Sequence, residues 1–480
     1  MSTSCKIPRE PLIAVIGATG TGKSKLAVDL AVRYGGEIIN GDAMQMYTGL
    51  PIITNQIPSE EREGIPHHLI SCIGFQEEPW RVNNFKRNCL RVIGEIRSRG
   101  KLPILVGGTH YYTQAVLFNE AIIEDDHREG SDDKPPETST SEKWPILDAP
   151  VEVMLEKLRE VDPVMAERWH PKESRKIRRS LEIWCQTGRP ASEVYEEQRR
   201  QRQAAATAAE QAITNESGTD TSPTSAPGQL RYPTLLFWLH AERQALQNRL
   251  EKRVDDMVQA GLFQEAQTLS NHLNDQESRG VAVDRTRGIW VSIGFKELEP
   301  YFSTKRRNSS TNEELEQARK MCIEAVKIST RQYAKQQVKW IKSKLWNALA
   351  SVGMTHRLYL LDTSNPDEWS STVREPSERV VDAFLTGDRA CPEPKELSDL
   401  ARETFDAKEK LGAPVDDGEM IQHITCDVCN KSMQAGVQWD SHIKSRSHKK
   451  VLRSIKRQAE IEAGFVRPRE KKEDDTVIGE

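Results

Sequence analysis

The stretch GATGTGKS, residues 17–24, follows the apolar run Leu12–Ile16 and precedes a segment with helical periodicity. Glycines at this spacing, followed by a lysine and a serine, are typical of a phosphate-binding P-loop between a strand and a helix. The glycines let backbone N–H groups face an anion, the start of the helix adds partial positive charge, and the serine can ligate Mg²⁺. We predict phosphate contacts from Gly17, Ala18, Thr19, Gly20, Thr21, Gly22, Lys23 and Ser24. The alternative is a glycine-rich turn without a ligand.

The surrounding segments predict an α/β fold with a parallel P-loop sheet as its core. Buried strands are expected at PLIAVIG, GEIIN and KLPILVGG, and helical stretches that stop at glycine lie between them. This alternation is typical of a parallel sheet. Further strands are expected at residues 234–240 and at RLYLLDTS, and long helices at residues 241–270 and 314–346.

The chain of 480 residues exceeds one typical domain, and we divide it by composition. Residues 11–148 are the first part of the core, with an acidic insertion at 122–143 that we expect to be disordered. Residues 149–232 form a mainly helical insertion domain with a low-complexity stretch at 203–229, and residues 233–385 complete the core. A linker at 386–420, a compact basic module at 421–458 and a polar tail at 459–480 follow.

Charge and hydropathy limit the function classes. The net charge is −4, so global charge does not indicate a nucleic-acid-binding protein, although local clusters can still bind one. No apolar run approaches the roughly 20 residues of a membrane span, so we predict no membrane partner. The cysteines do not form a secreted disulfide pattern, and the first residues do not resemble a secretory signal. We expect a cytoplasmic protein, with mitochondrial and nuclear locations left open.

Polar side chains follow two of the expected strands. Asp42 and Gln45 come after GEIIN, and Thr109 follows ILVGG. In a doubly wound sheet both turns open onto the same crevice as the P-loop. A lone aspartate at a strand end is usually a helix N-cap, but its position beside the P-loop favours a functional role. A P-loop NTPase usually holds Mg²⁺ with an aspartate that follows directly on a run of four apolar residues, and neither of these two strands ends in that way.

The basic module contains a set of metal ligands. Cys426, Cys429, His442 and His448 have the spacing C-x2-C-x12-H-x5-H, which predicts a structural Zn²⁺ site in a Cys₂His₂ finger. The helix around and after the histidines is strongly basic, with Lys444, Arg446, Lys449, Lys450, Arg453, Lys456 and Arg457. RNA binding is the favoured interpretation of this finger, and protein binding is the alternative.

Two other basic clusters lie on expected helices. The first is KESRKIRR, residues 172–179, and the second contains Lys327, Arg331, Lys335 and Lys339 at intervals of four residues. Like charges at this spacing repel one another, and a polyanion compensates for the repulsion by counterion release. Considered alone, a cluster such as residues 172–179 is more often a solvated helix face.

Seven motifs in the same order resemble the tRNA dimethylallyltransferases, also called tRNA isopentenyltransferases. They are GATGTGKS, INGDAMQMY, GIPHHL, VGGTHYY, RKIRRSLE, RVDDMVQAGLFQEA and IGFKE. The resemblance covers about residues 11–346 apart from the two insertions, and it extends to the finger, which is similar to the matrin or U1-like class of the eukaryotic form.

The resemblance implies a reaction for the crevice. The P-loop would hold the diphosphate of dimethylallyl diphosphate rather than ATP, with Mg²⁺ as cofactor. The N6 amine of adenosine 37, beside the tRNA anticodon, would attack C1 of the prenyl group, and diphosphate would leave. Asp42 matches the family's catalytic base, and Thr109 matches the residue between the diphosphate and the target nucleotide. Arg253 matches a catalytic arginine that contacts the diphosphate. Arg249, one turn earlier, is expected to bind the diphosphate as well.

The resemblance also implies a tRNA-binding surface. Its expected members are Asp42, Ala43, Met44, Gln45, Thr109, Arg175, Lys176, Arg178, Arg179, Gln186, Phe295, Lys327, Arg331 and Lys335. The chain departs from the common Ser-Asp-Ser pattern of the family, because Gly41 and Ala43 flank Asp42. The family further suggests a monomer.

Two other functions compete with this hypothesis. A P-loop nucleotide kinase or NTPase would turn over ATP, and it leaves the finger and the basic clusters unexplained. A non-catalytic RNA-binding protein with a vestigial P-loop would not need Asp42.

Overall fold

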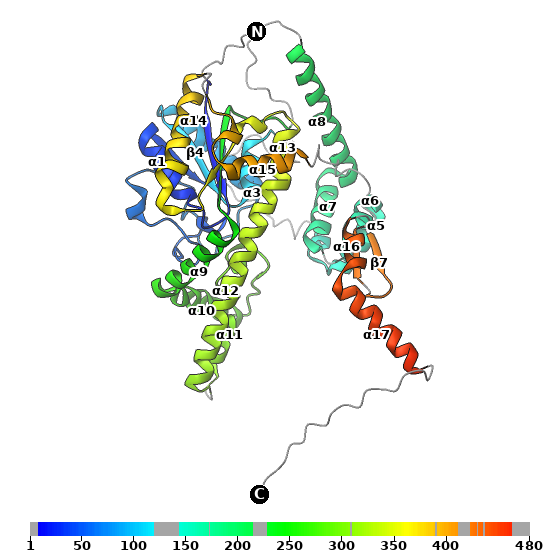
Figure 1. The fold of residues 1–480 in the computed structure, drawn as a ribbon. Helices are drawn as coiled ribbons and strands as arrows, with labels where there is room; N and C mark the ends of the chain where they lie inside the picture. Colours follow the sequence, from blue (N-terminus) through cyan, green and yellow to red (C-terminus); the bar gives the residue numbers. More distant parts are fainter. Residues whose placement is uncertain are drawn as a thin grey trace. The chain divides into compact units, whose positions relative to one another are not determined.

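The computed structural model describes residues 8–119, 144–171, 173–214, 228–307, 310–388, 391–410, 423–429, 431–434 and 437–462. The chain forms two compact units, residues 1–122 with 201–414 and residues 123–200 with 415–480 (Figure 1). Along the described parts of the chain, no helix combines the length and apolar character needed to cross a membrane.

The first unit is built on a six-stranded sheet with the order β3-β2-β4-β1-β5-β6. Its strands are β1 (Leu12–Gly17), β2 (Gly36–Asn40), β3 (His67–His68), β4 (Leu102–Gly107), β5 (Thr234–His240) and β6 (Leu358–Asp362). All five neighbouring pairs are parallel, which confirms the predicted P-loop sheet. The central strand β1 is paired by residues from far along the chain, because Leu12 lies opposite Thr234 in β5.

Helices cover both faces of this sheet (Figure 1). They are α1 (Lys23–Tyr34), α2 (Val82–Ser98), α3 (His110–Leu117), α9 (Arg243–Ala260), α10 (Leu262–Ser278), α11 (Glu299–Arg306), α12 (Asn312–Trp340), α13 (Trp346–Ala350), α14 (Glu375–Thr386) and α15 (Asp399–Lys410). Successive residues of β1 point to opposite faces: Ile13 joins the core under α1 and α14, and Ala14 joins the core under α2 and α12. Both faces of the strands are therefore apolar, as in other parallel sheets.

Short helical turns connect these elements. The 3₁₀ turns of the first unit are Met44–Met46, Ser59–Arg62, Gly288–Val291, Thr355–Arg357, Pro366–Glu368 and Pro394–Glu396. Two π-helical turns, Ile341–Leu345 and Ser370–Arg374, lie after α12 and before α14. The helix expected at residues 241–270 is divided at Gly261, whose φ of +115° ends α9 and begins α10.

The second unit holds the helical insertion up to Arg200, which lies within its last helix, and the finger. The insertion contains the 3₁₀ turn Pro145–Asp148 and the helices α5 (Val151–Val161), α6 (Pro163–Arg168), α7 (Ser174–Thr187) and α8 (Ala191–Thr214). The finger contains the antiparallel strands β7 (His423–Cys426) and β8 (Lys431–Gln434), then α16 (Val437–Lys444) and α17 (Arg446–Glu462). The low-complexity stretch at 203–229 begins as helix, because α8 extends to Thr214. The insertion expected at 122–143, most of the rest of that stretch and most of the tail at 459–480 lie outside the described residues.

The linker expected at residues 386–420 is in large part folded core. The segment contains α15, whose Ala401 and Phe405 are buried at 0% and 2% exposure in the main hydrophobic cluster. The ring of Phe405 stacks on Trp346 with 5.3 Å between centroids. The expectation was wrong because a single buried face on a short polar helix gives a weak sequence signal.

We expect Phe405→Ala to lower the free energy of unfolding by about 3–5 kcal/mol, since it removes a buried aromatic side chain. Glu403→Ala, an exposed change on the same helix, should alter it by less than about 0.5 kcal/mol. Urea denaturation of the full chain measures both. Equal stability of the two variants would mean that α15 is not part of the core.

Candidate active site

The phosphate loop connects β1 to α1 and depends on glycine backbones. Gly20 and Gly22 have φ values of +82° and +84°. A side chain at Gly17 would begin 2.5 Å from the carbonyl oxygen of Leu239 in β5. Inside the loop, Thr21 Oγ1 and Lys23 Nζ both donate to the carbonyl oxygen of Ala18, at 2.9 and 2.8 Å. These two bonds hold the loop in a tight curve.

The turns after β2 and β4 meet beside this loop, as the sequence predicted. The Ala43 N–H donates to Thr109 Oγ1 at 3.0 Å, and the Met44 N–H donates to Asp42 Oδ1 at 3.0 Å. Ala43 therefore binds Thr109 through its backbone and needs no hydroxyl for this contact. A side chain at Gly41 would begin 3.0 Å from Thr113 Cγ2, so the second departure from the family pattern coincides with close packing.

Asn40 holds the Asp42 turn, and sequence analysis did not identify it. Its Oδ1 accepts from the Asp42 N–H at 3.0 Å, and its Nδ2 donates to the carbonyl oxygens of Asp42 and Leu69 at 3.0 and 2.8 Å. Asn40 is 5% exposed, so these bonds are formed away from solvent. The only signal in the sequence was an asparagine two residues before an aspartate, a pattern typical of many turns.

Two arginines of α9 approach the loop in different ways. Arg253 Nη1 donates to Thr19 Oγ1 at 2.8 Å, which places its guanidinium at the start of the loop. Arg249 donates to backbone carbonyls of Gly20 (3.4 Å), Ser364 (3.0 Å) and Thr363. Arg249 thus ties the loop to the segment after β6, and a contact with diphosphate does not follow from its position.

Burial perturbs the charged groups of the crevice. Burial lowers the pKa of Lys23 to about 8, although Asp42 acts to raise it. Burial lowers the pKa of Arg253 to about 10, and Asp42 again opposes the shift. Burial raises the pKa of Asp42, while the Met44 N–H and Lys23 pull it down. One carboxylate thus lies close to two cations in a poorly solvated site, where charges interact strongly.

A glutamine of α12 joins the phosphate loop to the turn after β4. Gln337 Oε1 accepts from the Thr19 N–H at 2.8 Å, and its Nε2 donates to the carbonyl oxygen of Gly108 at 2.9 Å. One turn earlier, the Tyr333 hydroxyl shares hydrogen bonds with Thr109 and Gln337, and burial raises its pKa. Neither residue belongs to a motif that the sequence analysis used, so neither was predicted.

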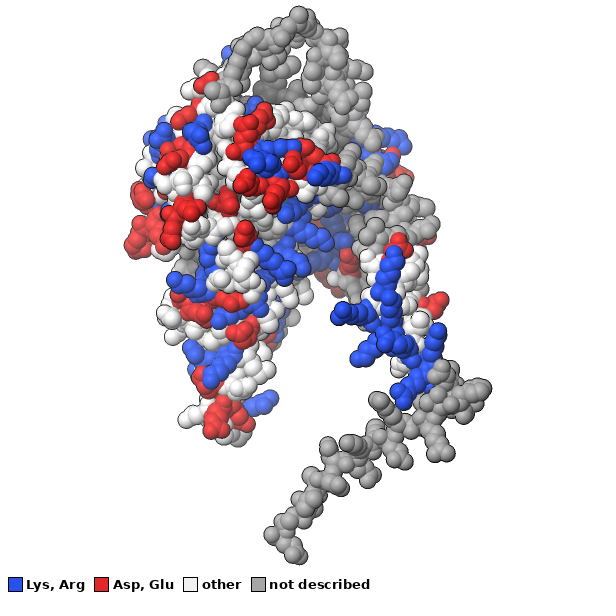
Figure 2. All heavy atoms as spheres, in the orientation of Figure 1, with Lys and Arg blue, Asp and Glu red and all other residues white. Residues whose placement is uncertain are grey.

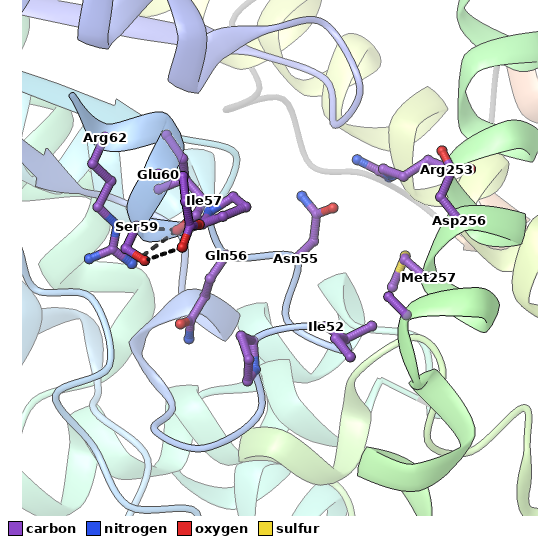
Figure 3. Close-up of a pocket in the computed structure, with 13 residues that line it drawn as sticks. Ile52, Asn55, Gln56, Ile57, Ser59, Glu60, Arg62, Arg253, Asp256 and Met257 are labelled. Atoms are coloured by element: carbon purple, nitrogen blue, oxygen red, sulfur yellow. Dashed lines mark hydrogen bonds between the residues drawn. The ribbon is translucent and has the colours of Figure 1, made fainter.

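A largely apolar cavity of about 530 Å³ opens beside Arg253. In Figure 3, Arg253, Asp256 and Met257 of α9 face a loop across the opening. The lining residues are Pro51, Ile52, Asn55, Gln56, Ile57, Pro58, Ser59, Glu60, Arg62, Arg253, Asp256, Met257 and Ala260. Gln45 lies at the same loop, because its Nε2 donates to the carbonyl oxygen of Asn55 at 3.0 Å. The guanidinium of Arg253 therefore lies between the phosphate loop and an apolar space.

The structure changes the expected tRNA surface of the first unit. Phe295 is fully buried and packs against Trp290, so the expected contact through its side chain is wrong. Lys327 pairs with Asp255 at 2.8 Å and Arg331 with Glu251 at 2.7 Å, so these two cations join α12 to α9. Lys335 is exposed on the same helix, as expected of a binding residue.

The basic residues of the helical insertion share α7. Arg175 and Lys176 are exposed, and Arg178, Arg179 and Gln186 are partly exposed. Acidic side chains lie beside three of the cations: Lys176 Nζ is 2.6 Å from Glu173, Arg178 is 3.2 Å from Asp148 and Arg179 is 2.9 Å from Glu182. The pairs of Lys176 and Arg178 are exposed enough to contribute little to stability and to exchange partners at low cost, whereas Glu182 is buried.

The four predicted metal ligands converge in the finger. Their ligand atoms lie within 4.8 Å of one another. His448 Nδ1 is 3.5 Å from both cysteine sulfurs and 3.2 Å from His442 Nε2. Zinc bond lengths imply tetrahedral edges of about 3.3 Å between two nitrogens and about 3.6 Å between nitrogen and sulfur. The cluster can therefore hold a metal ion, and the basic residues of the following helix are all exposed beside it (Figure 2).

Comparisons with known proteins agree with this geometry. The family model described as IPP transferase matches residues 45–344. The tRNA dimethylallyltransferase of Schizosaccharomyces pombe is 37% identical, covering 94% of this chain and 97% of that protein. The human tRNA dimethylallyltransferase is 33% identical, covering 93% of this chain and 87% of that protein.

A solved structure shares the fold as well. A eukaryotic dimethylallyltransferase crystallised acting on tRNA matches with a TM-score of 0.70 and 32% identity, covering 95% of this chain and all of that one. With the family model and the full-length relatives, this match shows that the chain belongs to the IPP transferase family, among the tRNA dimethylallyltransferases.

Proposed function

We propose that the chain transfers a dimethylallyl group from dimethylallyl diphosphate to N6 of adenosine 37 in tRNA. The new bond joins N6 to C1 of the prenyl group, the bond from C1 to the diphosphate oxygen breaks, and one proton leaves the amine. The products are N6-isopentenyladenosine and diphosphate. The observation that carries the proposal is the position of Arg253. Its guanidinium bonds Thr19 of the phosphate loop, interacts with Asp42 and lines a largely apolar cavity.

Asp42 is the proposed base for the amine proton. An adenine amine is a poor nucleophile, so a carboxylate that accepts its proton as the bond forms lowers the barrier. Burial raises the pKa of Asp42, whereas the Met44 N–H, Lys23 and Arg253 act to lower it and so favour the carboxylate form. Thr109 Oγ1, anchored on the Ala43 N–H, holds the turn that presents the carboxylate.

The leaving diphosphate accumulates negative charge, which the loop residues oppose. Backbone N–H groups of the loop, Lys23 and Arg253 supply the stabilising charge in a site with little water. Ser24 and the diphosphate oxygens would hold Mg²⁺, which adds positive charge at the leaving group. The cavity beyond Arg253, with Ile52 and Met257 in its wall, offers apolar surface to a five-carbon chain.

Recognition of tRNA is assigned to exposed basic residues. Lys335 on α12, the α7 residues Arg175, Lys176, Arg178, Arg179 and Gln186, and the basic helix of the finger are the proposed contacts. The finger is proposed to bind Zn²⁺, because its ligand distances fit a tetrahedral site. We further propose a monomer that acts in the cytoplasm.

One assay tests the reaction. Unmodified tRNA is mixed with labelled dimethylallyl diphosphate and Mg²⁺, with and without ATP. Transfer of label to tRNA without ATP supports the proposal, whereas ATP hydrolysis without transfer favours a P-loop NTPase.

Asp42→Asn should reduce kcat by about 10²–10⁴-fold, because the amide cannot accept the proton. Since burial raises the pKa of Asp42, activity of the wild-type protein should fall on acidification at a higher pH than an ordinary aspartate would cause. Single-turnover transfer across a pH series measures both effects. The exposed change Glu61→Gln is the control, and an active Asp42→Asn variant would contradict the assignment.

Substitutions of the two arginines of α9 should have different effects on activity and stability. Arg253→Met removes charge at the diphosphate and should lower kcat by about 10²–10³-fold. Arg249→Met removes bonds to three carbonyls and should lower the free energy of unfolding by about 1–3 kcal/mol, with a smaller effect on kcat. Transfer kinetics and urea denaturation of both variants decide, and a reversed pattern would exchange the two roles.

Cys426→Ser should remove one metal ligand and unfold the finger, because such modules depend on their metal. We expect a higher KM for tRNA and a kcat close to that of the wild-type protein. Steady-state kinetics and zinc content measure the effect. A parallel loss of kcat would mean that the finger takes part in the chemistry.

A further inference from the structure

A tryptophan from the segment after β6 lies on the phosphate loop. A side chain at Gly22 would begin 2.7 and 2.8 Å from two ring atoms of Trp369, so the indole lies directly against the loop backbone. Trp369 Nε1 donates to Asp29 Oδ2 at 2.9 Å, and Lys25 Nζ lies 4.7 Å from the ring centroid. Three residues along the loop and α1 therefore fix the ring over the point where the loop becomes helix.

The segment that carries Trp369 is anchored at several points, one of which joins it to the loop. The Thr363 N–H donates to the carbonyl oxygen of His240 at 2.8 Å, and Asp362 Oδ1 accepts from the Ser364 N–H at 2.9 Å. Arg249 bonds the carbonyls of this segment and of Gly20 with one guanidinium. The π-helical turn Ser370–Arg374 begins immediately after Trp369. Turns of this kind are rare and are frequent at functional sites.

The position of the indole restricts what the loop can hold. In a P-loop the backbone N–H groups cradle the α- and β-phosphates, so the nucleoside of a bound nucleotide begins at the wall of the loop. Trp369 covers that wall at Gly22 and Lys25. The apolar cavity lies elsewhere, beside Arg253, which bonds Thr19 near the start of the loop. A diphosphate with a short apolar chain has no nucleoside to place against the indole.

We propose that Trp369 is a specificity-determining residue that excludes nucleoside di- and triphosphates from the phosphate loop. The inference rests on the proposed prenyl diphosphate donor, and it gives a way in which a loop with a nucleotide-binding sequence would reject nucleotides. The ring acts by occupying space, and the Asp29 bond keeps it in place. Specificity of this kind comes from a clash with the wrong ligand rather than from a new contact with the right one.

The test compares the binding of ADP with that of inorganic diphosphate, both with Mg²⁺, by calorimetry on the full chain. The wild-type protein should bind diphosphate more tightly than ADP. Trp369→Ala should shift the affinity ratio toward ADP by about tenfold or more, since a steric block is removed. Trp369→Phe keeps most of the bulk and should shift the ratio much less. Trp184→Ala, which removes a partly exposed tryptophan from the other unit, should leave the ratio unchanged.

The affinity ratio separates exclusion from a purely structural role. If the role of Trp369 were purely structural, Trp369→Ala would lower the affinities for both ligands together and leave their ratio constant. That result would overturn the proposal. Equal affinities of the wild-type protein for ADP and diphosphate would overturn it as well. Trp369→Leu, which preserves an apolar contact with α1, gives the same readout if the alanine variant does not fold. Failure of the proposed prenyl transfer would appear in the transfer assay, independently of this ratio.

Discussion

A carboxylate and two cations share a poorly solvated crevice at the carboxyl edge of the sheet, and the rest of the site depends on the attraction of the carboxylate for both cations. Burial alone would drive Asp42, Lys23 and Arg253 toward their neutral forms. Asp42 favours the charged forms of Lys23 and Arg253, and both cations favour the charged form of Asp42, so removing the carboxylate changes the protonation of both cations. The cluster therefore behaves as one electrostatic unit. Its members come from β1–α1, from the turn after β2 and from α9, and the fold must bring these three together.

Polar side chains bring these three parts of the chain together by hydrogen bonding to backbone groups of separate segments. Asn40 closes the Asp42 turn, Gln337 joins the loop to the turn after β4, and Arg249 joins the loop to the segment after β6. Buried polar groups are costly unless they are paired, so each bridge also specifies one arrangement of its partners. These bonds between protein groups restrict the conformations of the phosphate loop, which limits the entropy that binding has to remove.

The sequence was sufficient for the sheet, the phosphate loop, the meeting of Asp42 with Thr109 and the convergence of the finger ligands. These features depend on local patterns and on the rule that parallel strands end at one edge. It was insufficient where the outcome depended on a partner from elsewhere in the chain. The spacing of Lys327 and Arg331 indicated a basic stripe, but the acids that pair with them lie on α9. Phe295 lies in a family motif, and a motif does not show whether a side chain is buried. Gln337 and Trp369 lie in none of the motifs that the sequence offered.

The pairing of β1 has a consequence for synthesis of the chain on the ribosome. Strand β1 bonds β4 on one side, but its other partner, β5, begins only at Thr234. At about 5–20 residues per second, β5 is made roughly 10–45 s after β1. During that interval the central strand has an open edge, and Lys23 and Asp42 exist without Arg253 and Gln337. The nascent first half is therefore the species most exposed to mispairing, and chaperone dependence is expected to end once β5 has docked.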